Sequence, residues 1–327
     1  MIVLANARRR ALLVFAATAA SSVLAPAHAA DRPPLRVILP VSAGSGVDTI
    51  VRAAAPALAK ELGGQAVVIE NMPGAGGITG TSALVKAAPD GNTIAFISNN
   101  HSVNPSVYKK MPYDSLADIT PISVVGSTPF VLVVNPTRLP ASNAKELVAL
   151  LKARPGAYNL ASSGNGTIIH LAGEMFDEAA GVDAKHIPYK GVGPMLADLI
   201  GGQVDFGVVA VPAVQGHLKN GTLRAIGVMG KTRVASLADV PTLTEQGFDV
   251  DVAGWFAVIG PPKLPAAEVK RLHDAVVAAF AEPDVRAAMA RQDNIIEPTT
   301  PEAAAQLLKS EQERYARLVR KANIAID

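Results

Sequence analysis

Three short loops rich in glycine and serine are the segments of this sequence whose residue types are best suited to binding a ligand. They are residues 42–46, 73–77 and 162–167, and each lies between a strand-like apolar run and a segment with helical spacing. The first N–H groups of a helix have no partner inside the helix, and the helix dipole adds about half a positive charge there. Three such ends facing one cleft would bind an anion without arginine or lysine. For any single loop, the alternative is a tight turn that binds nothing.

Other chemistry has weaker support in the residues. Residues 44–46 (Gly-Ser-Gly) follow a strand as in a dinucleotide-binding loop, but Thr49 stands where the third small residue belongs, and Asp48 would crowd a pyrophosphate. The chain has no Gly-x-Ser-x-Gly segment and no cysteine, so nucleophilic catalysis has no recognisable signature. An exported α/β enzyme stays open as an alternative, with Asp48 and His101 as its acid–base pair.

One pair of residues has the spacing of metal ligands. His170 and Glu174 are four residues apart and share one face of a predicted helix, which supplies two ligands but not a closed site. Packing of His170 at the helix start is the simpler interpretation. We therefore expect no metal and no cofactor.

The elements that must position the three loops follow an α/β order. Apolar runs at 35–41 and 65–70 flank a helical segment at 47–62, and a right-handed crossover makes these two strands parallel. A helix at 78–88 and a strand at 93–98 continue the pattern. The first hundred residues therefore predict an α/β lobe.

The pattern restarts at an apolar strand over 130–134. The elements expected after it are strands at 158–161, 204–209, 224–228 and 255–262 and helices at 143–153, 168–180, 194–200, 266–280, 283–292 and 301–321. The sequence predicts two lobes, the first discontinuous (30–129 and 251–327) and the second formed by 130–250. The hinge would be two crossing strands near Phe130 and Trp255, with Trp255 as a bulky anchor.

Composition favours a packed, exported protein. The 327 residues are 49% hydrophobic and 18% charged, which suits a globular chain of about two domains. Residues 1–29 contain three arginines and no acidic residue, so the formal charge of +2 falls to about −1 without them. A chain with that balance has no bulk positive field for nucleic acid or an anionic membrane, and we expect neither as a partner.

Residues 1–29 have the pattern of a secretory signal peptide. Arg8, Arg9 and Arg10 precede an apolar run at 11–17, and small residues end at Ala29, the expected cleavage site. A membrane anchor is the alternative, but two serines and a proline interrupt the short apolar stretch. Without a cysteine at the cleavage site, lipid anchoring is excluded. We predict a periplasmic, monomeric protein exported by the general or the twin-arginine route.

Several segments together resemble the extracytoplasmic solute receptors of tripartite tricarboxylate transporters, often called Bug-type or TctC-type receptors. The resemblance covers nearly all of the mature chain and depends on the order and spacing of modest motifs. These are PVSAGSGVDTIVR (40–52), ENMPGAGG (70–77), PDG (89–91), Asn104-Pro105 with Tyr108, MPYD (111–114), SSGNGT (162–167) with His170-Leu171, PYKG (188–191), GGQVD (201–205) and DVPTLTE (239–245).

The resemblance implies a type II periplasmic-binding-protein fold, a Venus flytrap whose two lobes close over a small carboxylated metabolite. In this family the carboxylate is held mainly by backbone groups and ordered water at loops that match the three described above. The expected ligand-binding residues are Val41, Ser42, Ala43, Ser45, Asp48, Gly74, Ala75, Gly76 and Asn99 in the first lobe and Ser162, Ser163, Thr167 and Val209 in the second.

One departure from the family pattern bears on the ligand. The family often carries an acidic residue near the position of Val209, where it would face the amino group of an amino acid. Its absence here predicts a carboxylate without an ammonium group, rather than aspartate or glutamate. The expected partner is a set of membrane transporter subunits or, for an orphan receptor, a sensor kinase.

Overall fold

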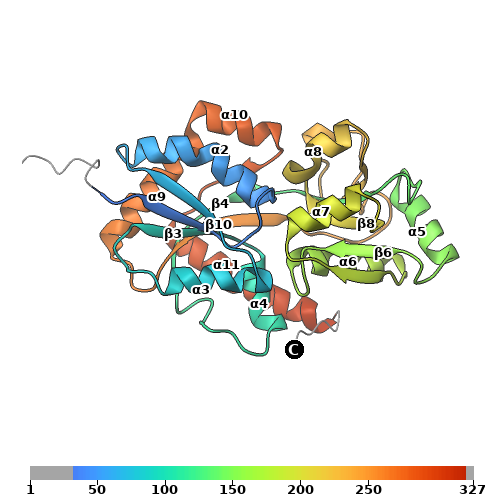
Figure 1. Ribbon diagram of the computed structural model, residues 1–327, viewed down its shortest axis with the longest axis horizontal. Helices are drawn as coiled ribbons and strands as arrows, with labels where there is room; N and C mark the ends of the chain where they lie inside the picture. The colour runs from blue at the N-terminus through green and yellow to red at the C-terminus, as the bar shows by residue number, and fades with distance from the viewer. Residues whose placement is uncertain (1–31, 322–327) are drawn as a thin grey trace, which may run out of the picture.

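Two β-sheets, one in each half of an elongated molecule, form the frame of the computed structural model, which describes residues 32–321 (Figure 1). We call the half with the six-stranded sheet lobe 1 and the half with the five-stranded sheet lobe 2. The predicted signal peptide lies outside the described residues. Among these residues, no helix is both long and apolar enough to cross a membrane.

The sheet of lobe 1 has the strand order β11-β4-β10-β3-β1-β2. Its strands are β1 (Leu35–Leu39), β2 (Val67–Asn71), β3 (Thr93–Ser98), β4 (Thr120–Thr128), β10 (Gly254–Gly260) and β11 (Ile295–Ile296). Strand β1 pairs in parallel with β2 and β3, which confirms the predicted βαβ unit, whereas β10 pairs antiparallel with β3 and β4. The loops after β1 and β3 therefore open at one edge of the sheet.

The helices of lobe 1 cover both faces of its sheet. They are α2 (Gly46–Glu61), α3 (Ile78–Val85), α4 (Asn100–Val107), α9 (Ala266–Ala281), α10 (Pro283–Arg291) and α11 (Pro301–Lys321), with a short 3-10 turn, η2 (Ala75–Gly77), before α3. Residues of α2, α9 and α10 form one apolar core with one face, and residues of α3 and α11 pack on the other. Figure 1 shows α2 and α10 above the strands and α3 and α11 below them.

The sheet of lobe 2 has the order β7-β6-β8-β5-β9. Its strands are β5 (Phe130–Val134), β6 (Asn159–Ser162), β7 (Lys185–Pro188), β8 (Phe206–Ala210) and β9 (Arg224–Val228), and its helices are α5 (Ala144–Ala153), α6 (Ile168–Ala180), α7 (Val192–Ile200) and α8 (Val211–Lys219). Strand β6 runs parallel to β7 and β8, and β5 runs antiparallel to β8 and β9.

Two connections carry the chain between the sheets, one at Pro129 and one at residues 251–253, before β10. Backbone hydrogen bonds tie both to lobe 2, because Val211 N donates to Pro129 O at 3.0 Å and Val252 N donates to Met229 O at 2.8 Å. The buried Asn99 joins the second connection to lobe 1. It accepts from Trp255 N at 2.9 Å and donates to Ala253 O at 3.2 Å and to the Tyr315 hydroxyl at 2.7 Å.

Strand β4 is an element that the sequence reading missed. Pro121 and Gly126 within it look like strand breakers, but β4 pairs with β10 through two irregularities in register that accommodate such residues. Gly126 is required where it stands, because a Cβ there would collide with the backbone carbonyl of Ile295 in β11. Helices α4 and α8 were also missed; Pro105 lies within α4, and Pro212 near the start of α8.

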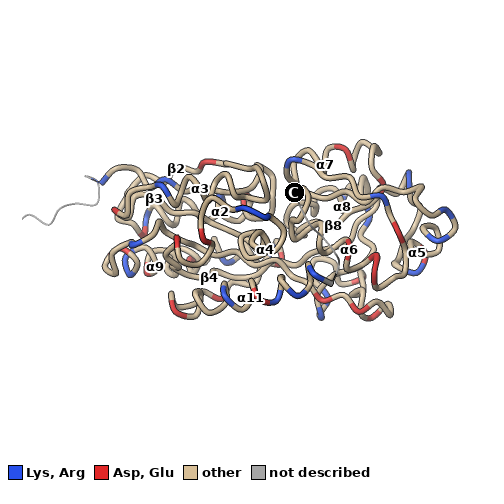
Figure 2. The backbone as a smooth tube through the Cα atoms, turned by 90° about the horizontal axis from the view of Figure 1, so that it is seen from below, with Lys and Arg blue, Asp and Glu red and all other residues tan. Residues whose placement is uncertain are grey.

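Charged side chains are interspersed over both lobes. Figure 2, which turns the molecule by 90°, shows acidic and basic residues alternating along the outer helices and loops of the two halves. Arginine or lysine commonly pairs with a nearby carboxylate, as Arg233 does with Glu245 and Lys60 with Glu282. Such exposed pairs add little stability.

Candidate functional site

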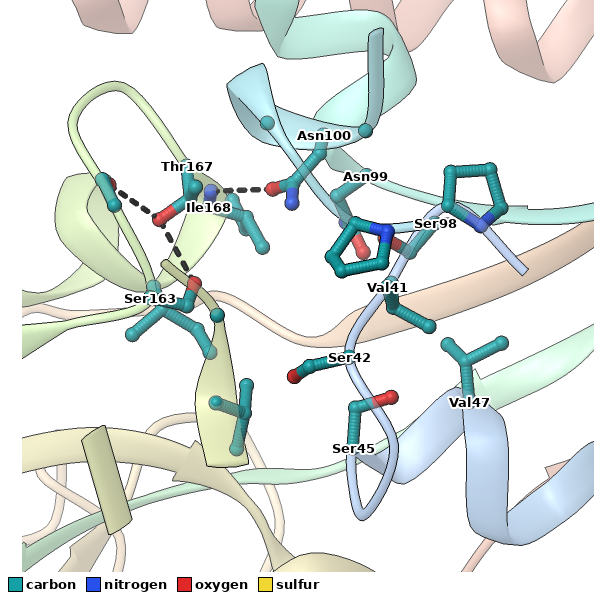
Figure 3. Close-up of a pocket in the computed structure, with 18 of the residues that line it drawn as sticks. Val41, Ser42, Ser45, Val47, Ser98, Asn99, Asn100, Ser163, Thr167 and Ile168 are labelled. Atoms are coloured by element: carbon teal, nitrogen blue, oxygen red, sulfur yellow. Dashed lines mark hydrogen bonds between the residues drawn. The ribbon is translucent and has the colours of Figure 1, made fainter. Parts of the chain in front are cut away.

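A cavity of about 540 Å³ lies between the two lobes, beside the two hinge connections. Its walls come from the loops before α2, α3, α6 and α7, and its floor includes Thr128, Phe130 and Trp255. Figure 3 shows the side chains of the loop before α2 facing those of the loop before α6 across this space. The three strand–helix loops therefore line one cavity, as the sequence predicts.

The loop before α2 presents backbone donors to the cavity. Ser45 caps the helix, since its hydroxyl accepts from Asp48 N at 3.3 Å. Within the described residues, the N–H groups of Gly46 and Val47 have no hydrogen-bond partner, and both residues line the cavity. This pair of amides at a helix start can accept an oxyanion.

Asp48 stabilises this loop by hydrogen bonds and does not line the cavity. Its carboxylate accepts from Gly44 N at 3.0 Å, from Arg52 Nε at 2.9 Å and from Asn71 Nδ2 at 2.9 Å. Its side chain is 6% exposed. The carboxylate of Asp48 therefore shapes the loop, and the lining of the cavity gives no support to the predicted ligand contact at this residue.

The loop before α3 bends through consecutive residues with positive φ. Gly74, Ala75, Gly76 and Gly77 have φ angles of 129°, 47°, 62° and 97°. Such backbone is open to glycine and strained for other residues, so the three glycines are needed here. The amides of Ala75 and Gly76 have no partner among the described residues and line the cavity. Asn104 Nδ2 fixes the turn by donating to Gly76 O at 3.2 Å.

The loop before α6 supplies the matching surface of lobe 2. Thr167 caps α6 by accepting from His170 N at 3.3 Å, and its hydroxyl donates to Gly164 O at 2.9 Å. Ser163 Oγ donates to Thr167 Oγ1 at 3.1 Å, as Figure 3 shows. Ser163 and Thr167 both line the cavity, as do Gly164 and Asn165.

Two hydrogen bonds cross between the lobes at the cavity. Ile168 N, the first amide of α6, donates to Asn100 Oδ1 of lobe 1 at 2.7 Å (Figure 3). Gly193 N in the first turn of α7 donates to Ser42 Oγ of lobe 1 at 3.3 Å. A side chain of lobe 1 thus accepts from a first-turn amide of α6 and of α7, and the lobes are in contact in this structure.

The floor of the cavity is mainly apolar. Phe130 and Trp255 are 4% and 7% exposed, and Trp255 Nε1 donates to Glu311 at 3.0 Å, on the side of α11. Thr128 also lines the cavity, and its buried Oγ1 has no hydrogen-bond partner among the described residues. The floor can therefore pack against the apolar part of a ligand.

Nine of the thirteen predicted site residues line the cavity. They are Val41, Ser42, Ser45, Gly74, Ala75, Gly76, Asn99, Ser163 and Thr167. The other four predicted residues do not line it. Asp48 shapes its loop, Ala43 is exposed, Ser162 is fully buried with its hydroxyl on His186, and Val209 is fully buried in β8. Neighbours alternate faces along a strand, and Ala210 borders the cavity in place of Val209.

The residues that sequence reasoning missed come mostly from other elements. They include Asn100, Tyr108, Thr128, Phe130, Tyr189, Lys190, Val192, Ala210 and Trp255. The PYKG motif at 188–191 was a signal for two of them, Tyr189 and Lys190, since it ends a strand shortly before a helix. Nothing local marks Thr128 or Asn100, because their places in the wall depend on the pairing of β4 with β10 and on contact between the lobes.

The lining carries little charge. Among the described residues that line the cavity, Lys190 is the one basic residue, and there is no aspartate or glutamate. The acid–base pair of the enzyme alternative is not assembled there, because neither Asp48 nor His101 borders the cavity. His101 is buried against Ser115 O at 2.7 Å, and this burial lowers its pKa to about 4. The described residues also hold no cluster of three or more side chains able to bind a metal.

A cavity between two α/β lobes, walled by helix starts from both, defines a two-lobed solute-binding protein. The model of the tripartite tricarboxylate transporter family receptor matches residues 50–324, so the chain belongs to that family. BugT of Bordetella pertussis is 36% identical over 313 residues, which are 94% of this chain and 95% of BugT.

Solved structures confirm the predicted type II periplasmic-binding-protein fold. The periplasmic binding protein BugD matches with a TM-score of 0.86 and 31% identity, over 90% of this chain and 99% of BugD. A protein of R. palustris solved with adipate also matches with a TM-score of 0.86, at 28% identity over 90% of this chain and 99% of that one.

Proposed function

We propose that this protein is an extracytoplasmic receptor that captures a small carboxylate by closure of its two lobes. The observation that carries the proposal is the set of unpartnered helix-start amides in the cavity wall, at Gly46, Val47, Ala75 and Gly76. These donors suit a carboxylate, and they leave little need for a cationic side chain. The family relationship and the adipate bound to a related protein support the same class of ligand.

The ligand lacks an ammonium group. A buried ammonium is stabilised best by an anionic partner, and the lining has no carboxylate side chain among the described residues. Val209 does not bear on this point, because it is packed inside the sheet. The apolar surfaces of Val41, Phe130 and Ile168 favour a ligand with a hydrocarbon body.

Closure supplies the signal that binding has occurred. A ligand that bridges both lobes binds the closed form better than the open form and shifts the population toward it. The closed form is then recognised by a membrane transporter or a sensor kinase in the periplasm, where the predicted signal peptide would deliver the chain. The cavity wall holds no assembled acid–base pair, which favours a receptor over an enzyme.

Mass spectrometry of the natively purified protein tests this function directly. We expect an unchanged small carboxylate to be released on denaturation, and isothermal titration of the emptied protein to show binding of short dicarboxylates such as adipate but not of aspartate. Tight aspartate binding would overturn the assignment of an ammonium-free ligand. Turnover of the released molecule by the protein would favour the enzyme.

A further inference from the structure

The backbone of the loop before α6 is held by groups beneath it, on the side away from the cavity. Gly164 N donates to Ser162 Oγ at 3.2 Å, and Gly166 N donates to His170 Nδ1 at 3.0 Å. The intervening amides of Ser163 and Asn165 have no partner among the described residues, and both residues line the cavity. Alternate amides are thus directed inward to the protein, which leaves the others for a ligand.

Two stacked histidines supply the inner side of this arrangement. The rings of His170 in α6 and His186 in β7 have centroids 3.7 Å apart and lie within 8° of parallel. His186 Nε2 is 2.6 Å from Ser162 Oγ, and His170 Nε2 is 3.3 Å from Glu174 Oε1. His170 therefore binds a loop amide directly, at Gly166. His186 contacts Ser162, whose hydroxyl binds the other loop amide, at Gly164.

The hydrogen-bond pattern indicates the tautomer of His170. Because His170 Nδ1 accepts from Gly166 N, it carries no proton, and Nε2–H donates to Glu174. That hydrogen bond lowers the pKa of the Glu174 carboxyl. Burial lowers the pKa of His186 to about 4. Two parallel rings at this distance are compatible with neutral imidazoles, since a second positive charge would be repelled.

We propose that His170 and His186 are positioning residues for the lobe 2 half of the ligand site. Through neutral ring nitrogens they fix which amides of the loop at 163–167 face the protein and which face the cavity. Neither histidine touches a ligand. The inference rests on the proposed function only in taking this loop as part of the binding site.

The competing explanation is that the histidines merely fill space beneath the loop. The two explanations can be distinguished by substitutions that keep either the bulk of the histidine ring or its hydrogen-bonding atom. Asparagine at position 170 places Oδ1 near the site of Nδ1, and glutamine at position 186 reaches with a polar atom toward Ser162. Leucine at either position keeps apolar bulk and removes the acceptor. If the histidines only fill space, the leucine variants should preserve the loop better. If they position the loop, the asparagine and glutamine variants should preserve it better.

Hydrogen exchange measured by NMR on the protein without added ligand is the main test. We expect His170→Leu to speed exchange of the Gly166 amide by about threefold to tenfold, the effect of losing one hydrogen bond, and His170→Asn to restore it. His186→Leu and His186→Gln should act in the same way on Gly164. Equal exchange in the leucine and polar variants would overturn the proposal.

A second measurement protects the test against variants that do not fold. The 15N shifts of the wild-type histidines report their tautomers, and we expect an unprotonated Nδ1 in His170 at pH 7. A protonated Nδ1 would refute the proposal without any substitution. Titration with adipate tests whether the loop geometry affects ligand binding. We expect His170→Leu to weaken the affinity for adipate and His170→Asn to leave it unchanged. Because the first two measurements need no ligand, a failure of adipate to bind would count against the proposed function and leave this inference standing.

Discussion

Gly46 gives the most direct test of closure, because it lies where the two lobes meet. A Cβ added at Gly46 would lie 2.9 Å from the Cβ of Ala210 in lobe 2. Ordinary contacts of such atoms fall at 3.4–4 Å, so Gly46→Ala requires the lobes to separate by about 0.5–1 Å. The residue has no positive φ, so alanine suits its helical backbone within lobe 1.

The size of the effect follows from where the clash occurs. Overpacking a close contact costs about 1–3 kcal/mol, and here that cost falls on the closed form alone. Since about 1.4 kcal/mol corresponds to tenfold in affinity, Gly46→Ala should weaken binding of a carboxylate by roughly 5-fold to 150-fold. The free energy of unfolding should change by less than about 1 kcal/mol, because alanine is also the better helix former.

Calorimetric titration measures the loss of affinity, and small-angle scattering measures how far the lobes close. With adipate as the probe, we expect weaker binding by Gly46→Ala and a smaller contraction of the radius of gyration at saturation. Gly216→Ala is the matched control, because Gly216 also lies in a helix, α8, and a Cβ there meets nothing within 4 Å. If Gly46→Ala and Gly216→Ala both bind and contract like wild type, the contact between Gly46 and Ala210 does not limit closure of the lobes.

Three further predictions concern the second loop, a buried carboxyl and the hinge. Gly76→Asp should bind adipate about tenfold more weakly than Gly76→Asn, because the two share the strain of a positive φ and the contact with Asn104 and differ in charge; equal affinities would remove this loop from the anion site. Burial raises the pKa of Asp177 from 3.8 to about 7, so the folded state binds more protons than the unfolded state between these values and stability falls as the pH rises. Asp177→Asn should therefore stabilise the protein by about 2–4 kcal/mol at pH 8 and have little effect near pH 3.5, measured by urea unfolding; a gain independent of pH would contradict this. Asn99→Ala should lower the free energy of unfolding by about 2–4 kcal/mol in the same assay, through loss of three buried hydrogen bonds, and an unchanged urea midpoint would show that the hinge does not depend on them.

Much of the fold was predictable because it depends on local patterns. The parallel pairing of β1 with β2 follows from apolar runs separated by a helical segment, and a right-handed crossover leaves one arrangement. Strand β4 was not predictable in this way, because its proline and glycine are tolerated only through the irregular pairing with β10 and the close approach of β11. Distant partners thus overrode the local signal.

Residue types alone were enough to predict a candidate site at the strand–helix loops rich in glycine and serine, since helix starts expose amides wherever such loops occur. Which residues of those loops face the cavity depends on how the chain packs in three dimensions. A shift of one residue along β8 exchanges Val209 for Ala210, and the carboxylate of Asp48 is directed to Arg52 and Asn71. These orientations depend on partners far away in the chain, which no local pattern of residue types specifies.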